Sequence, residues 1–74
     1  MLKLPIVSGD NCIKVLEKCG YIKDHQKGSH MIMVKSGRIP ITVPRHYELD
    51  AGLLRSIIRD TGLSVRQFTA LLKK

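Results

Sequence analysis

The 74-residue chain carries 13 Lys and Arg residues against six Asp and Glu residues, which gives a net charge of +7. A chain of this length forms one domain at most, and its 43% hydrophobic content argues against intrinsic disorder. Its apolar runs are far shorter than the ~20 residues that span a bilayer, so we expect no membrane partner. The basic charge instead favours an anionic partner, with nucleic acid as the first candidate.

The chain begins with the segment MLKLPIVSG, which is too short for a signal peptide, so we expect a cytoplasmic protein. An amphipathic helix follows, with Ser8 as its N-cap and Gly20 at its C-terminal end. Asp10 falls in the first turn, where the helix dipole favours a negative charge. The apolar face of this helix consists of Cys12, Ile13, Val15, Leu16 and Cys19.

The two cysteines lie on this one helix, seven positions apart. At 1.5 Å per residue their backbones are ~10.5 Å apart, whereas a disulfide needs Cα atoms within about 7 Å. No His or carboxylate cluster accompanies them, so they also fall short of a zinc site. We therefore predict two unpaired core cysteines, no metal site and no cofactor.

From Tyr21 to Val43 the pattern is typical of β-structure. Strands are predicted at residues 21–26, 30–35 and 39–43, and the turns KGS and SGR between them each contain a glycine. Such short links predict an antiparallel meander. Pro40 has no N–H to donate to a ladder, so the third strand is expected either at a sheet edge or with the missing donor pointing away from its neighbour.

Two further helices are predicted after the strands. The first has Asp50 as N-cap and ends at Gly62, and the second, shorter one has Ser64 as N-cap. Their apolar stripes consist of Leu53, Leu54, Ile57 and Ile58, and of Val65, Phe68, Leu71 and Leu72. A sheet with helices on a single face is an α+β two-layer sandwich, and with this charge it suggests a double-stranded-RNA-binding-domain-like fold.

Four segments occur in a distinctive order: LEKCGY, KGSH, ITVPRH and LDAGLLRSIIRDTGLSVRQFTALL. In this order the chain resembles the HicA family of small toxins from toxin–antitoxin modules, from about Cys12 to Leu72. It departs from the family at Leu53, where Thr is frequent, and at Met31 and Met33, where an aromatic residue or a second His often follows the Gly-Ser-His. These departures bear on packing or RNA contact more than on the reaction.

The resemblance implies that residues 1–74 form a single ribonuclease domain that cleaves messenger RNA without the ribosome. It implies that the histidine of the Gly-Ser-His motif, His30, is the catalytic residue. It further implies a HicB-type antitoxin as the protein partner that covers the site.

The chemistry of RNA is compatible with this role, because the 2′-hydroxyl beside the scissile phosphate needs only a base and an acid, and no metal. Histidine can act as either near neutral pH, so His30 is predicted as general acid or base. Nearby cations can stabilise the extra charge on the transition state. The predicted RNA-binding residues are Lys27, Gly28, Ser29, Lys35, Arg38, Arg45 and His46.

Strand alternation leaves open which face of the second strand is buried, because His30, Ile32 and Val34 share one face while Met31 and Met33 share the other. If His30 lies on the open face, its apolar neighbours form a patch that an antitoxin could cover. A small helix or the chain's tail could cover it instead.

Histidine and charge also allow other interpretations. His25 has the pattern of a solvated strand residue. A non-catalytic double-stranded-RNA-binding module would use the same fold and charge, without cleavage. A DNA-binding helix-turn-helix over the last two helices would present Arg66, Gln67 and Thr69 to bases, although Ile58 is bulky for a close helix crossing.

Overall fold

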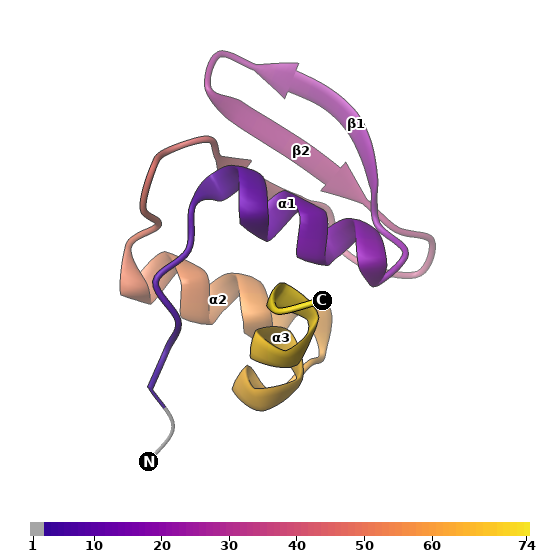
Figure 1. Ribbon diagram of the computed structural model, residues 1–74. Helices are drawn as coiled ribbons and strands as arrows, with labels where there is room; N and C mark the ends of the chain where they lie inside the picture. Colours follow the sequence, from indigo (N-terminus) through magenta and orange to yellow (C-terminus); the bar gives the residue numbers. More distant parts are fainter. Residues whose placement is uncertain (1–2) are drawn as a thin grey trace.

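A computed structural model describes residues 3–74, so the first two residues of the N-terminal segment lie outside the description. The elements are α1 (Gly9–Lys18), β1 (Ile22–Lys27), β2 (His30–Val34), β3 (Ile41–Pro44), α2 (Ala51–Thr61) and α3 (Val65–Leu72). The helices lie on one side of an antiparallel sheet of order β1-β2-β3 (Figure 1). The predicted α+β sandwich and its element order are confirmed.

The three helices begin where the capping residues predict. The side-chain oxygens of Ser8, Asp50 and Ser64 each accept a backbone N–H from the first turn of the helix that follows. Gly62 ends α2 with a φ of 80°, a left-handed conformation that costs glycine little. These ends are set by local hydrogen bonds, which is why the sequence shows them.

The strands form the predicted meander with β3 at an edge, but two of them start later than predicted. Tyr21 is not in β1, because its N–H bonds the Leu16 carbonyl at 3.0 Å and closes the end of α1. Residues 39–40 lie outside β3, which starts at Ile41, directly after the proline that has no donor. Both shifts follow from where backbone N–H groups find partners.

The sheet has a buried inner face and an open outer face. Met31 and Met33 of β2 are 8% and 0% exposed, so they face the helices. His30, Ile32 and Val34 therefore lie on the outer face. The buried core consists of Val7, Cys12, Ile13, Val15, Leu16, Tyr21, Met31, Met33, Ile41, Val43, Leu49, Leu54, Ile57, Ile58 and Phe68.

The two cysteines are unpaired, as predicted. Cys12 is fully buried in the core, and this burial raises the pKa of its thiol to about 12. Cys19 is half-buried at the end of α1. Within residues 3–74, no three His, Cys, Asp or Glu side chains gather in a way that would hold a metal ion.

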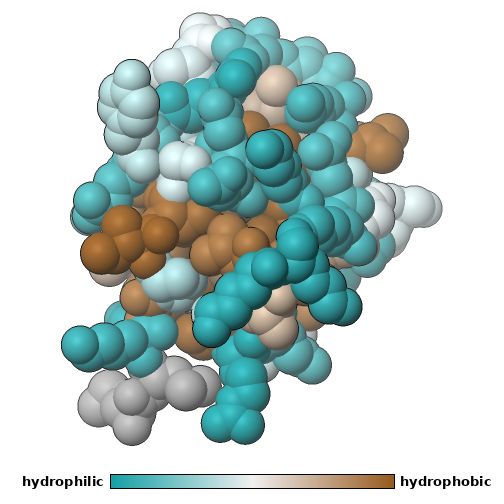
Figure 2. All heavy atoms as spheres, viewed as in Figure 1, coloured by the Kyte–Doolittle hydropathy of each residue, from teal (hydrophilic) through white to brown (hydrophobic). Residues whose placement is uncertain are grey.

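β1 contains a β-bulge at Asp24. Lys23 pairs with Met33 and His25 pairs with Ile32, so two steps along β1 match one step along β2. β1 is exposed along its whole length, because the hairpin curls away from the helices (Figure 1). Figure 2 shows that the surface over this part of the molecule is mainly hydrophilic, above a band of apolar surface.

None of the helices within residues 3–74 has the length and apolarity needed to cross a membrane.

Candidate functional site

His30 is the first residue of β2 and is exposed on the outer face of the sheet. Its neighbours across the ladder are Lys27 of β1 and Pro44 of β3. A shallow hollow of about 480 Å³ opens beside it. The hollow is lined by His25, Lys27, His30, Ile32 and Thr42.

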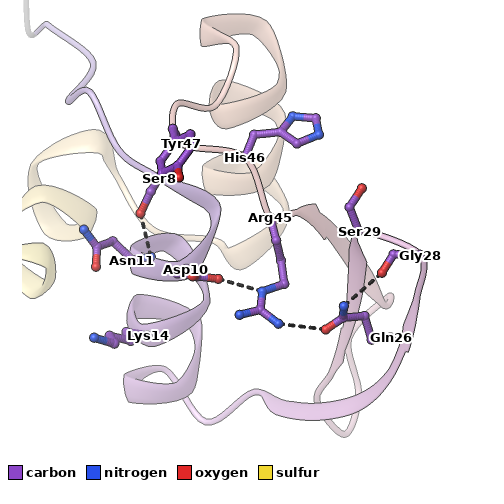
Figure 3. Close-up of a pocket in the computed structure, with 10 residues that line it drawn as sticks. All are labelled: Ser8, Asp10, Asn11, Lys14, Gln26, Gly28, Ser29, Arg45, His46 and Tyr47. Atoms are coloured by element: carbon purple, nitrogen blue, oxygen red, sulfur yellow. Dashed lines mark hydrogen bonds and ion pairs between the residues drawn. The ribbon is translucent and has the colours of Figure 1, made fainter.

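A larger hollow of about 1150 Å³ lies beyond the β1–β2 turn, where the start of α1 and the segment after β3 meet it (Figure 3). It is lined by Ser8, Asp10, Asn11, Lys14, Gln26, Gly28, Ser29, Arg45, His46 and Tyr47. Lys27 and His30 line the first hollow, whereas Gly28 and Ser29 between them line the second. The turn is therefore the boundary between the two.

Arg45 ties the hairpin to the first helix. Its Nε donates to Asp10 Oδ1 at 2.7 Å, and its Nη1 donates to Gln26 Oε1 at 2.9 Å (Figure 3). Gln26 in turn donates its amide N–H to the Gly28 carbonyl at 2.9 Å. The hydrogen bond from Arg45 lowers the pKa of the Asp10 carboxyl, and the same bond raises the pKa of Arg45.

Backbone contacts hold the same region together. The Arg45 N–H donates to the Ser29 carbonyl at 2.7 Å, and the Gly9 N–H donates to the His46 carbonyl at 2.8 Å. A Cβ at Gly9 would lie 2.0 Å from the Pro44 oxygen, so only glycine allows this approach. The start of α1, the end of β3 and the residue before His30 are thus packed in one place.

Two predicted RNA-binding side chains project from this framework. The Ser29 hydroxyl and the His46 ring extend toward the same side of the larger hollow (Figure 3). Both residues are exposed. Gly28 beside them has a φ of 61°, the left-handed conformation that a tight turn requires. The arrangement leaves a hydroxyl, an imidazole and a bare stretch of backbone accessible from solvent.

Lys35 and Arg38 lie at the other end of the sheet. Lys35 is five positions after His30, or ~16 Å along an extended chain. Its Nζ donates to the Cys19 carbonyl at 2.6 Å and lies 5.6 Å from the centre of the Tyr21 ring. Arg38 packs its guanidinium against Gly62. The structure therefore does not bring these two cations to His30, although they are near it in sequence.

His25 is brought to His30 instead. It is exposed, as predicted for a solvated strand residue, with 58% of its side chain accessible. The bulge places it on the outer face, in the same hollow as His30, and its Nδ1 lies 2.6 Å from the Asp24 carboxylate. A bulge changes which residues of a strand share a face, but it has no sequence signature of its own. The only indication of this arrangement in the sequence was that Asp24 directly precedes His25.

The last two helices offer little for base recognition. The Gln67 side chain accepts the Ser64 N–H at 2.9 Å in a capping box, and the Thr69 hydroxyl donates to the Val65 carbonyl at 2.8 Å. Two of the three residues predicted to contact bases are thus engaged within the helix, and Arg66 is the one that takes part in neither hydrogen bond. This weakens the helix-turn-helix interpretation.

Comparison with known proteins agrees with the motifs. A family described as the HicA toxin of bacterial toxin–antitoxin modules matches residues 9–63. No curated protein matches the chain. The matched segment includes α1, the whole sheet and α2, and with them every residue that lines the two hollows except Ser8. The chain therefore belongs to the HicA toxin family, and its role is that of the toxin in a toxin–antitoxin module, with an antitoxin as its partner.

Proposed function

We propose that this toxin is an endoribonuclease that cleaves messenger RNA without a metal ion, and that His30 carries the reaction. The supporting observation is the position of His30, which is exposed on the open face of the sheet, opposite a lysine and beside a hollow. An exposed histidine at a strand start adds little to packing. A role in chemistry explains its presence better than a role in the fold.

The reaction needs a proton acceptor for the 2′-hydroxyl and a proton donor for the leaving 5′-oxygen. An imidazole can serve as either near neutral pH, and a positioned one contributes about 10²- to 10⁴-fold. Lys27 is directly opposite His30 in the ladder, where its ammonium can stabilise the charge that develops on the phosphate. No cofactor is required for these steps.

RNA would continue from His30 across the turn into the larger hollow. Gly28 and Ser29 offer a backbone and a hydroxyl for a phosphate, and His46 and Arg45 add an imidazole and a partly exposed guanidinium. Lys35 and Arg38 would reach only more distant nucleotides of a longer strand, since they lie at the far end of the sheet.

A HicB-type antitoxin would cover the same face. Ile22 is 64% exposed on the outer face, and Ile32 and Val34 beside it are partly exposed. Apolar residues on the same face as His30 form a surface that a protein partner can bury. We further propose that the whole chain acts as one domain in the cytoplasm. The single-domain part of this proposal is supported by Phe68 of α3, which is buried in the same core as the sheet.

The test uses the purified protein with a long single-stranded RNA in EDTA. The parent and a Lys23→Ala control should cut the RNA, because Lys23 is exposed and pairs with Met33 on the inner face. His30→Ala should lose about 10²- to 10⁴-fold in rate with an unchanged circular dichroism spectrum.

Two outcomes would contradict the proposal. Cleavage by His30→Ala at the parent rate would place the chemistry elsewhere. RNA binding by both proteins without cleavage by either would favour the non-catalytic double-stranded-RNA-binding module.

A further inference from the structure

The shallow hollow on the outer face holds two histidines, and the proposed function uses one of them. We propose that His25 is a second catalytic residue, and that His25 and His30 act as an acid–base pair on one RNA phosphodiester. This inference rests on the proposed ribonuclease activity and adds a group to it.

The β-bulge is what brings the two histidines together. In an unbroken ladder starting from Lys23 and Met33, His25 would pair with Met31 and share the inner face. The extra residue, Asp24, moves His25 one step so that it pairs with Ile32 on the outer face. His25 and His30 then line the same hollow. Bulges commonly re-aim a side chain next to an active site.

The ladder also sets the spacing. Ile32 is opposite His25, and His30 is two residues from Ile32 on the same face, so the two histidines are diagonal neighbours. Diagonal neighbours in a sheet lie about 7–8 Å apart. This distance refers to the backbones, and side chains that start this far apart on one face can both reach a single phosphate in the hollow that they line. Lys27 is opposite His30 and completes a triangle of two imidazoles and one ammonium.

Asp24 orients the ring of His25. A carboxylate only accepts hydrogen bonds, so the 2.6 Å contact requires the Nδ1 of His25 to be the donor. Nε2 is then the ring nitrogen left to exchange a proton with a substrate. Consecutive side chains of a regular strand point to opposite faces, and the bulge is what allows these two to meet. A base oriented by a third group is a recurring feature of catalytic sites.

Stability does not account for this pair. The side chains of His25 and Asp24 are 58% and 52% exposed, and exposed ion pairs contribute little to folding. β1 is exposed on both faces, so packing does not select its residues. A catalytic role gives the bulge and the pair a common explanation.

The proposed step is balanced in atoms and charge. One histidine removes the proton of the 2′-hydroxyl while the 2′-oxygen attacks phosphorus. The bond from phosphorus to the 5′-oxygen breaks, and the other histidine donates its proton to that oxygen. The products are a 2′,3′-cyclic phosphate and a 5′-hydroxyl, and no oxidant, reductant or co-reactant is consumed.

The experiment compares the parent with His25→Ala, His30→Ala and the Lys23→Ala control on a short 5′-labelled single-stranded RNA in EDTA. kcat and KM are measured from acidic to alkaline pH. The parent should give a bell-shaped kcat profile with an acid and a base limb. His25→Ala should lose about 10²- to 10⁴-fold in kcat with little change in KM, and it should lose one limb of the profile.

Two further measurements separate a chemical role from a structural one. Added imidazole should restore part of the kcat of His25→Ala and should leave Lys23→Ala unchanged. Asp24→Asn keeps the size of the side chain but replaces the charged acceptor of the His25 Nδ1 hydrogen bond with a neutral amide. It should therefore lower kcat, but less than His25→Ala does.

The outcomes distinguish the two proposals. If His25→Ala keeps the kcat and both limbs of the parent while His30→Ala loses activity, His25 is not catalytic and the ribonuclease proposal stands. The proposal of a catalytic His25 is also contradicted if His25→Ala loses activity, does not respond to imidazole and keeps both limbs of the pH profile. If the folded parent does not cleave, both proposals fail.

Discussion

The two faces of the sheet differ in what their residues do. Over β2 and β3 the inner face is closed by the helices and carries Met31, Met33, Ile41 and Val43, all at most 8% exposed. The outer face carries His25, Lys27, His30 and Thr42, all exposed. The inner residues are therefore selected by packing, and the outer residues are free to serve a ligand. Substitutions on the two faces should change different measured quantities.

The largest contrast should come from two neighbours on β2. Met33→Ala removes a fully buried side chain and should lower the free energy of unfolding by about 2–5 kcal/mol. Ile32→Ala on the outer face should lower it by less than about 1 kcal/mol, since this side chain is already partly exposed. Urea denaturation measures both values. Equal losses would contradict the assignment of the faces.

A total stability of about 5–15 kcal/mol is typical of a small domain, so Met33→Ala alone could leave the chain largely unfolded. Met33→Leu is the matched variant for that case, because it conserves volume and should cost less than about 1.5 kcal/mol. The difference between the leucine and alanine variants then reports the packing of the inner face.

A smaller contrast is expected between two lysines. Lys27→Ala should weaken binding of a short RNA and reduce the slope of log affinity against log salt by about 0.7–1, without changing the unfolding midpoint. Lys35→Ala should leave the short-RNA slope unchanged, but it should lower stability by about 0.5–1 kcal/mol through its contact with the Tyr21 ring. Filter binding at several salt concentrations and urea denaturation test the pair. The reverse pattern would place the RNA at the other end of the sheet.

The smallest effect concerns the ion pair between Asp10 and Arg45 that ties the hairpin to α1. The pKa of Asp10 is lowered by its hydrogen bond with Arg45, so the unfolded chain binds more protons in acid than the folded chain does. The stabilisation is present above the usual carboxyl value of 3.8 and is lost as the pH falls through the lower folded value. The urea concentration at which half of the parent is unfolded should therefore decrease as the pH is lowered through this acidic range.

Asp10→Asn should show a flatter pH dependence in the same range and a slightly lower midpoint at neutral pH. Both groups are exposed, so the change is expected to be small. An identical acid profile for the parent and the variant would show that the pair adds nothing to folding.

Much of the fold could be predicted from the sequence because it depends on neighbours in the chain. Ser8, Asp50 and Ser64 cap their helices with hydrogen bonds to residues two or three positions away. The glycine turns and short links predicted the meander, and the spacing of apolar residues predicted the faces of α1 and α2. The motifs in their order were enough to indicate the toxin family.

The candidate site was decided by contacts between segments distant in the chain. Alternation along β2 was compatible with either face being buried, and only packing against the helices placed His30 outside. The bulge that turns His25 outward depends on the register between two strands, and the separation of Lys35 from His30 depends on the direction of β2. The sequence by itself determined the elements and the family, because local hydrogen bonds and periodicity set them. Tertiary structure alone decided which side chains share a surface, because register and burial arise only when the elements pack together.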